Sequence, residues 1–554
     1  MSVGNSRRGA RGRAAALGRT FGALLCLSIA LSSGCARRDP PAATDSSARV
    51  LRISQRNEPA DLDPARATLP DEFFILRALS EGLVNPLPLT SSTGAVAGVA
   101  PGVAERWETS ADGLIVTFHL RADARWSNGD PVTAEDFLAS YRRALQPATA
   151  ASKAPLFHLV KNARAFASGA LTDFAGVGFA APDPRTFVIT LERPEPNFLV
   201  YAASGPWLPV HPRTVEQHGR DWTRPENFVG NGPFTLEEWR PNQRIVVRRN
   251  PHYHSPQRVR LDEIQFIAFD SGDTEERAYR AGQIDVTMSV PFSKLDVYAA
   301  ERPAELHRAP LAETRYLSFN TTRPPLDNPR VRRALSLALD REQLVHSVLR
   351  GGQQPADTLV SPLLRGRNSS LNRPISFDPA AARQLLAEAG FADGRGFPQL
   401  ELSAWGVTPQ LIEAVQQMWQ KELGVRVAIT IREARVHLAA LREARYDIAL
   451  VNTIPDVADP ADVLKDFLSA APANYPHWSD ARYDALLAAA HASSEPIPRQ
   501  AQLDAAEARL LDECPLTPLY FNSINWLMSP RVRGWQPDAL WTRFYLDVEI
   551  TPPR

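Results

Sequence analysis

The pattern of hydrophobic and polar residues predicts short strands and helices that alternate along the chain. Residues 50–54, 114–120 and 187–191 are rich in apolar and β-branched residues over the length of a strand. Residues 425–431 alternate apolar residues with polar or small ones, which is the period of a strand, whereas residues 408–424 repeat apolar residues at helical spacing. Alternation of this kind favours an α/β fold.

Local signals predict where individual helices begin. Thr133, followed three residues later by Asp136, forms a capping box, so we expect a helix from there to about Leu145. The turn pair Asn128-Gly129 separates this helix from the strand before it. Residues 71–83 are predicted to form another helix, which ends at a Gly-containing turn.

The N-terminus has the pattern of an export signal. Its arginines are followed by an apolar run, residues 21–31, that is too short to span a bilayer. Leu31-Ser32-Ser33-Gly34-Cys35 then resembles the lipobox at which a bacterial lipoprotein is cleaved and acylated, although Ser32 stands where the motif usually has an aliphatic residue. We therefore expect a signal peptide over residues 1–34, lipidation of Cys35 and a tether over residues 35–48. Ordinary cleavage nearby, which leaves a free periplasmic protein, is the alternative.

Composition and charge narrow the class of protein. The chain of 554 residues is 44% hydrophobic and 22% charged, as expected of a soluble globular protein with more than one domain. Lys+Arg and Asp+Glu both total 62, and five arginines precede Cys35, so a chain cleaved there carries 57 basic against 62 acidic residues, a net charge of −5. This balance gives no support to nucleic-acid binding. Cys514 is expected to be a small buried hydrophobe, and acylation of Cys35 would leave no intramolecular disulfide.

Three segments carry a resemblance to a known family. The first lies within residues 101–145 and contains Glu105-Arg106-Trp107, Phe118-His119-Leu120-Arg121, Trp126-Ser127-Asn128-Gly129 and Thr133-Ala134-Glu135-Asp136-Phe137. Residues 231–254 and 328–349 are the other two. Together they resemble the family 5 extracellular solute-binding proteins of bacterial ABC transporters, whose best-known members bind oligopeptides.

The resemblance implies an α/β, periplasmic-binding-protein-like two-lobed clamp of type II, a three-domain cluster of mixed sheets with flanking helices. Its first domain is discontinuous. The expected boundaries are residues 49–90, 199–310 and 523–554 for domain I, 91–198 for domain II and 311–522 for domain III.

No catalytic motif that we sought occurs in the chain. Glycine fingerprints for phosphates or dinucleotides, G-x-S-x-G, H-E-x-x-H and C-x-x-C are all missing from the sequence. We therefore expect neither an enzyme nor a bound cofactor or metal. His252 and His254 form the only close histidine pair, and we expect them to lie in a solvated loop.

The resemblance also suggests which residues contact a ligand. Asp456 follows the predicted strand 446–451, and ligands of open α/β sheets collect at the carboxyl ends of strands. In peptide-binding family members an aspartate at the matching place pairs with the ligand's α-ammonium; a turn-forming aspartate is the alternative here. Thr453 and Lys153 replace aromatic residues of the pattern, and Trp405 either lines the cavity or packs in the core. The C-terminal aromatics, Trp541 among them, are expected to pack in the core or at the hinge.

The function that follows is capture of oligopeptides between two lobes and delivery to ABC permease subunits in the inner membrane. We expect a monomer in the periplasm or cell envelope, held at the membrane through lipidated Cys35. The same fold with another cargo (nickel or a metal chelate, haem, an opine or an oligosaccharide) is the main alternative. An exported hydrolase and a lipoprotein receptor without a permease are two others.

Overall fold

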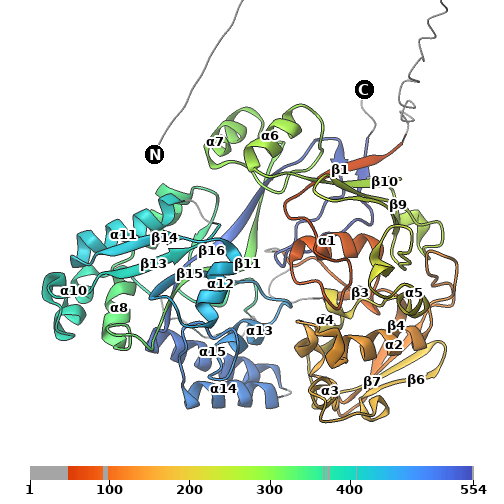
Figure 1. Cartoon of the computed structure of the whole chain (residues 1–554), viewed down its shortest axis with the longest axis horizontal. Coiled ribbons are helices and arrows are strands. Elements are labelled where there is room, and N and C mark those ends of the chain that lie inside the picture. The colour runs from red at the N-terminus through yellow and green to blue at the C-terminus, as the bar shows by residue number, and fades with distance from the viewer. Residues whose placement is uncertain are drawn as a thin grey trace, which may run out of the picture. The chain divides into compact units, whose positions relative to one another are not determined.

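The computed structural model describes residues 48–90, 98–365, 369, 371, 375–406, 409–493 and 495–551. The chain divides after Ser46, and every described residue belongs to the unit Ser47–Arg554. Residues 1–47 lie outside the described residues. They comprise the predicted signal peptide, Cys35 and nearly all of the predicted tether. The described unit forms two lobes, each built around its own sheets (Figure 1).

The first lobe contains two four-stranded sheets, with strand orders β1-β10-β9-β8 and β4-β5-β7-β6. β1 runs parallel to β10, and the other neighbours in these two sheets are antiparallel. The strands are β1 (Val50–Gln55), β4 (Ala104–Thr109), β5 (Ile115–Leu120), β6 (Phe179–Asp183), β7 (Thr186–Thr190), β8 (Phe234–Arg240), β9 (Arg244–Arg249) and β10 (Glu263–Ala268). Two short pairs are β2 (Val84–Pro86) with β3 (Val99–Pro101), and β17 (Val532–Arg533) with β18 (Glu549–Ile550).

The second lobe is built on one six-stranded sheet of order β12-β16-β11-β15-β13-β14. β13 is parallel to both of its neighbours, β14 and β15, and the remaining pairs are antiparallel. The strands are β11 (Leu306–Phe319), β12 (Gln354–Pro355), β13 (Leu400–Ala404), β14 (Val427–Ile431), β15 (Ile448–Thr453) and β16 (Leu516–Leu527).

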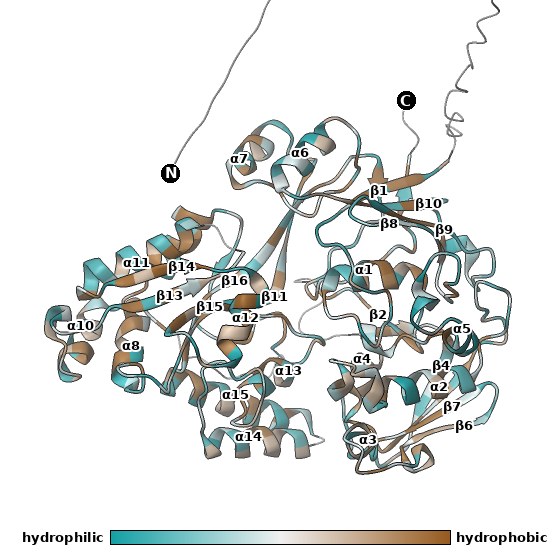
Figure 2. Ribbon diagram, viewed as in Figure 1, coloured by the Kyte–Doolittle hydropathy of each residue, from teal (hydrophilic) through white to brown (hydrophobic). Residues whose placement is uncertain are grey.

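Helices accompany both groups of sheets. Those from the first part of the chain are α1 (Pro70–Leu79), α2 (Ala134–Leu145), α3 (Ala163–Ala167), α4 (Phe198–Ala202), α5 (Pro212–His218), α6 (Gly272–Arg280) and α7 (Phe292–Glu301). Those from the second part are α8 (Pro329–Leu337), α9 (Arg341–Gln343), α10 (Pro379–Glu388), α11 (Pro409–Leu423), α12 (Ala434–Arg442), α13 (Pro460–Leu464), α14 (Ala481–Ala492) and α15 (Pro496–Glu513). Helices such as α10 and α11 carry both hydrophobic and hydrophilic stretches (Figure 2), as expected of helices with one buried face.

Two long strands, β11 and β16, connect the lobes. Ala309 and Trp526 at one end of this pair pack into the core around β1, β8, β9 and β10, whereas Leu317 and Leu519 at the other end pack into the core of the six-stranded sheet. The register of the pair is interrupted after Pro310. A break in a strand ladder bends and twists the strand locally.

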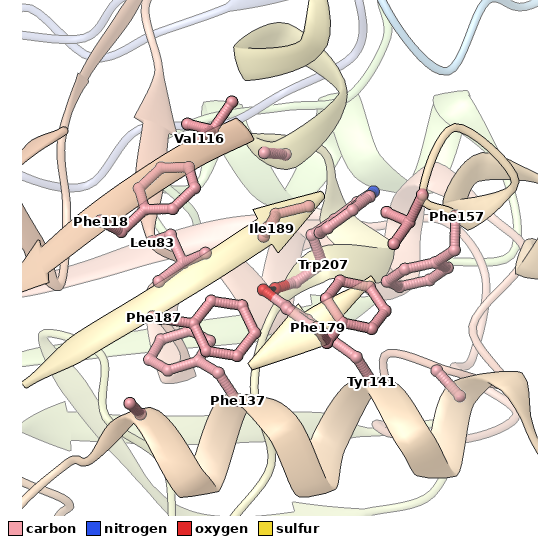
Figure 3. Packing of buried hydrophobic residues seen from close by; sticks show 14 of the residues in the cluster. Leu83, Val116, Phe118, Phe137, Tyr141, Phe157, Phe179, Phe187, Ile189 and Trp207 are labelled. Carbon is pink, nitrogen blue, oxygen red and sulfur yellow. Dashed lines mark hydrogen bonds between the residues drawn. The ribbon is translucent and has the colours of Figure 1, made fainter. Parts of the chain in front are cut away.

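The core of the β4-β5-β7-β6 sheet is largely aromatic. Phe137 and Tyr141 point from α2 toward the sheet (Figure 3), where the Tyr141 ring lies 5.1 Å from that of Trp207. Phe157 stacks on Trp207 at 4.4 Å, and Phe187 is fully buried. Edge-to-face and offset contacts of this kind add to the free energy gained by burying the rings.

Several expectations from the sequence are confirmed. α2 begins at Ala134, directly after Thr133, whose backbone N–H donates to the Asp136 carboxylate at 2.8 Å. α11 lies within the predicted range 408–424, and Cys514 is buried.

The helix predicted for residues 71–83 is shorter than expected. α1 ends at Leu79, because Ser80 has an extended backbone and the backbone of Glu81 is held by another segment of the chain. The side chain of Asn231 accepts from the Glu81 N–H and donates to its carbonyl, at 2.9 and 2.8 Å. A partner 150 residues away thus ends the helix before the predicted stop.

One of the two paired histidines is not solvated. His252 is exposed, but the side chain of His254 is only 6% exposed, and its Nε2 lies 2.7 Å from the Glu81 carboxylate. Tyr253 donates to the same carboxylate at 2.8 Å. The solvated-loop expectation is therefore wrong for His254, which helps to anchor the segment after β9.

Within the described ranges, no helix combines the length and the apolar character needed to cross a membrane.

Candidate ligand-binding site

A cavity of about 230 Å³ lies where the two lobes meet. Its wall draws on widely separated parts of the chain, within residues 68–77, 86–89, 200–206, 454–458 and 540–542, together with Gly98 and Lys153. Most of the lining side chains are apolar; they include Leu69, Phe73, Leu87, Val200, Ile454 and Leu540. Such a cavity at a junction of domains is the usual place for a small-molecule ligand.

Asp456 reaches the cavity from the loop after β15. This strand is central in its sheet, between β11 and the parallel strand β13, so the loop begins at the carboxyl end of a strand. The backbone N–H of Asp456 donates to the Asp462 carboxylate on α13 at 2.7 Å. This contact fixes the loop and aims Asp456 at the other lobe.

Lys153 is the partner of Asp456 across the cavity wall. Its Nζ lies 2.5 Å from Asp456 Oδ1, and the two side chains are 24% and 30% exposed. Lys153 stands directly before the 3₁₀ turn Ala154–Phe157, 303 residues away in sequence. A short, partly buried ion pair therefore joins the two lobes at the place where the sequence suggested a ligand contact.

Two further acidic side chains, Asp462 and Asp466, lie near Asp456. Asp462 is buried and forms an ion pair with Lys465, and burial raises the pKa of Asp462. Burial also raises the pKa of Asp466 to about 7, with the nearby Asp462 and Asp456 acting in the same direction. Charges at this end of the cavity are thus coupled to one another.

A second polar contact joins the lobes at Asp459, three residues after Asp456. Asp459 caps α13 and is fully buried, and its Oδ2 lies 2.7 Å from Arg499 Nη2 on α15. Asn197, directly before α4 in the first lobe, donates to the same carboxylate at 2.8 Å. Between the two polar contacts Val457 packs against Leu156 and Tyr201, so the interface has an apolar centre.

Three further lining residues had not been assigned a ligand role from the sequence. Arg77 on α1 is half-buried and donates to the carbonyl of Ala203. Phe73 stands one turn earlier on the same helix, and Trp541 contributes from the C-terminal segment with a left-handed backbone, φ 58°. The indole N–H of Trp541 is buried and has no hydrogen-bond partner among the described residues. The available signal for Arg77 was a lone charge within the apolar run of residues 73–79 in α1.

Trp541 also lines a second cavity, of about 260 Å³, with a more polar wall. This wall includes Arg56 and the ion pair between Arg315 and Glu313, whose atoms are 3.0 Å apart. Trp541 thus stands between the apolar cavity and the polar one, although its predicted role was packing alone.

Thr453 and Trp405, the other two candidates, are not among the lining residues of the first cavity. Thr453 is buried at the end of β15, and its hydroxyl accepts from the backbone N–H of Thr314 on β11, at 3.2 Å. Trp405 is half-buried directly after β13, and its neighbour Gly406 borders the polar cavity. The structure thus brings together Asp456 and Lys153, and the ligand role of all four residues stays a prediction.

Among the described residues, no group of three or more His, Cys, Asp or Glu side chains is arranged to hold a metal ion.

Two lobes joined by crossing strands, with a cavity between them, define an α/β binding protein of the clamp class. Residues 98–475 match the family of bacterial extracellular solute-binding proteins, family 5, and the chain belongs to this family. It is a family of binding proteins, and the solute-binding role expected from the sequence is confirmed at this level.

Three relatives from Escherichia coli K12 show how far the similarity extends. The chain is 33% identical over 494 residues to the probable deoxycholate-binding periplasmic protein YgiS, covering 88% of this chain and 90% of the relative. It is 31% identical over 523 residues to the periplasmic murein peptide-binding protein MppA, covering 93% and 95%. It is also 31% identical over 525 residues to the periplasmic oligopeptide-binding protein OppA, covering 93% and 94%.

Solved structures of MppA confirm the expected fold class. The structure of the murein tripeptide-binding protein superposes with a TM-score of 0.80 at 29% identity, covering 91% of this chain and 98% of that one. The unliganded open form of MppA gives 0.72 at the same identity, covering 91% and 97%.

Proposed function

We propose that the protein is the substrate-binding component of an ABC importer, which captures oligopeptides between its two lobes and delivers them to a membrane permease. The observation that carries this proposal is the cavity between the lobes of a family 5 solute-binding protein. Relatives of nearly the same length are named for the binding of murein peptides and oligopeptides, which supports a peptide cargo.

The mechanism follows from the crossing strands. Rotation about β11 and β16 separates or joins the lobes, and a ligand that contacts both of them favours the closed arrangement through its differential affinity. We propose that Asp456 and Lys153 form the ionic part of the ligand site, because they meet across the two lobes at the cavity wall. Thr453 and Trp405 remain candidates for positions beyond this cavity.

A peptide panel tests the cargo. Isothermal titration of the purified protein with di- to pentapeptides should give a saturable 1:1 isotherm, with a negative heat-capacity change for the burial of apolar surface. Heat-capacity change and stoichiometry together separate capture in the cavity from weak surface association. Absence of binding across the whole panel would remove peptides as the cargo.

A second cargo class is favoured by the apolar wall of the cavity. One relative is named as a probable deoxycholate-binding protein, and such a ligand combines an apolar body with one carboxylate. An amphipathic acid is therefore the second candidate, to be tested by the same titration with deoxycholate.

We also propose a periplasmic location, because three relatives are named as periplasmic proteins. Acylation of Cys35 would hold the protein at the membrane. Mass spectrometry of the N-terminal peptide from the native host tests this directly: a diacylglyceryl mass on Cys35 is expected, and an unmodified cysteine or a cleavage site elsewhere would contradict it.

A further inference from the structure

The cavity between the lobes has three charged side chains on its wall: Arg77, Lys153 and Asp456. The other lining residues are apolar or uncharged. Whether the cavity prefers an anionic or a cationic ligand therefore depends on which of these three charges is already compensated inside the protein.

The negative charge is compensated. Asp456 has the ammonium group of Lys153 at 2.5 Å, which is the contact that a ligand's α-ammonium would otherwise make. A ligand amine must displace Lys153 to reach this carboxylate. It would then leave the lysine without its partner in a partly buried place, and this cost offsets the contact that the amine gains.

One positive charge, that of Arg77, is compensated only in part. Among the described residues no carboxylate lies within ion-pair distance of Arg77, whose hydrogen bond goes to the neutral carbonyl of Ala203. Burial lowers the pKa of Arg77 to about 10, and the Asp538 carboxylate opposes this effect from farther away. The Asp538 oxygens are occupied by the backbone N–H groups of Leu89, Leu540 and Thr542, at 2.8 to 3.0 Å.

A half-buried guanidinium beside apolar surface is costly unless an anion meets it. Its fork of N–H donors matches a carboxylate, with which it can form two parallel hydrogen bonds. We propose that the cavity takes a ligand with a carboxylate on an apolar body, that Arg77 binds this carboxylate, and that Lys153 replaces the ligand's ammonium at Asp456. The inference rests on the proposed function of solute capture and names the chemical class of the solute. The carboxylate can be the C-terminus of a peptide or the acid group of an amphipathic acid.

The test compares trileucine with its N-acetyl and C-terminal amide forms by isothermal titration of the purified wild-type protein. N-acetylation should change the dissociation constant by less than about threefold, whereas amidation should raise it by about tenfold or more. A loss of about tenfold on N-acetylation, with no loss on amidation, would overturn the inference and leave peptide capture intact. This comparison needs no variant and is therefore independent of any folding defect.

Two substitutions of Arg77 test whether this residue causes the difference in affinity between the free acid and the amide. Arg77→Met should abolish the difference between the free acid and the amide, and Arg77→Lys, which keeps the charge but not the fork, should restore part of it. The matched control is Arg121→Met, because Arg121 is also half-buried and also donates to a backbone carbonyl, but it lies outside the cavity wall. Lys153→Met should make trileucine bind more tightly than its N-acetyl form, because Asp456 is then free.

Titration with deoxycholate distinguishes the two possible sources of the carboxylate, a peptide C-terminus and an amphipathic acid. If deoxycholate binds and the peptides do not, and Arg77→Met weakens its binding by about tenfold or more, the inference stands and the peptide cargo is wrong. If Arg77→Met leaves the binding of every carboxylate ligand as unchanged as Arg121→Met does, the assignment of Arg77 is overturned, whichever ligand binds.

Discussion

At the scale of single residues, the proposed ligand preference depends on which charges of the cavity wall already have a partner inside the protein. Lys153 and Asp456 neutralise each other across the lobes, and Asp462 and Lys465 do so behind them. Charge substitutions here are therefore expected to alter binding more through the partner that they leave behind than through the contact that they remove.

Asp456→Asn tests this expectation. It leaves Lys153 uncompensated on the cavity wall, so the affinity for a carboxylate ligand should stay within about threefold of the wild type or increase. Titration of trileucine into both proteins measures it, and circular dichroism checks that the variant is folded. If Asp456 instead binds the ligand's ammonium, the affinity should fall by about 30-fold or more.

Asp466 gives a prediction on pH. Because burial raises its pKa to about 7, the folded protein keeps a proton on Asp466 between about pH 4 and 7 that the unfolded chain has lost. Its contribution to stability is thus complete below pH 4 and is lost as the pH rises through 7.

The measurement is urea unfolding of the wild type and Asp466→Asn at pH 5 and pH 8. The free energy of unfolding of the wild type, relative to the variant, should fall by roughly 1–3 kcal/mol between the two values. Asp270→Asn, at an exposed position, is the control and should show no such change. A constant difference between wild type and Asp466→Asn would contradict the prediction.

At the scale of elements, α15 anchors the segment after β12. Glu507 on this helix is buried and accepts from the backbone N–H groups of Leu359 and Val360, both at 2.8 Å, and from Arg365 at 2.6 Å. One side chain therefore satisfies donors from a segment more than 140 residues away.

Glu507→Ala leaves these three donors without their acceptor, and should lower the free energy of unfolding by roughly 3–5 kcal/mol. Glu507→Gln keeps one acceptor oxygen and should cost less, about 1–3 kcal/mol. Glu342→Ala, at an exposed glutamate, should cost less than about 0.5 kcal/mol in the same urea titration. Equal costs for Glu507→Ala and Glu342→Ala would show that Glu507 has no anchoring role.

The short turn Gly205–Trp207 shapes the cavity through its glycine. A Cβ on Gly205 would lie 2.2 Å from the ring of Phe73, and both residues line the cavity. Gly205→Ala therefore forces the ring to move at the cavity wall.

We expect this substitution to weaken ligand binding by roughly tenfold, which corresponds to about 1.4 kcal/mol, with a smaller effect on the melting temperature. Gly272→Ala is the control: its Cβ would meet only Ser289 Oγ, at 3.3 Å, and Pro291, away from the cavity. If the two variants bind ligand equally well, Phe73 does not limit the space in the cavity.

The elements that could be predicted from the sequence are those with local causes. The capping box at Thr133 determines where α2 begins, and the strand period of residues 425–431 corresponds to β14. The end of α1 could not be predicted, because Asn231 acts on it from a distant part of the chain.

The site was predictable only in part, for the same reason. The place of Asp456 after a strand, together with the family resemblance, makes it a candidate, but nothing local shows that Lys153 lies 2.5 Å from it. Trp541 becomes recognisable as a cavity residue only when the folded chain places it on the wall, and the lone charge of Arg77 in an apolar stretch did not by itself indicate a cavity.

At the scale of the whole molecule, the proposed capture requires lobes that open and close around the solute. The contacts between the lobes near the cavity include the ion pair of Lys153, the hydrogen bond from Asn197 to Asp459 and the packing of Val457. Ionic contacts of this kind can be broken and remade, because the desolvation of the charged groups offsets much of their attraction. Ligand contacts with both lobes then decide which arrangement predominates.

We propose that the cavity between the lobes captures a carboxylate-bearing peptide for transport. The most direct measurement is native mass spectrometry of residues 36–554, expressed in a bacterial periplasm and purified without denaturation. We predict a set of bound masses that correspond to several short peptides with free C-termini, and that disappear in Arg77→Met but persist in Arg121→Met. A single bound mass that is not a peptide, or a peptide set that Arg77→Met leaves unchanged, would contradict the claim.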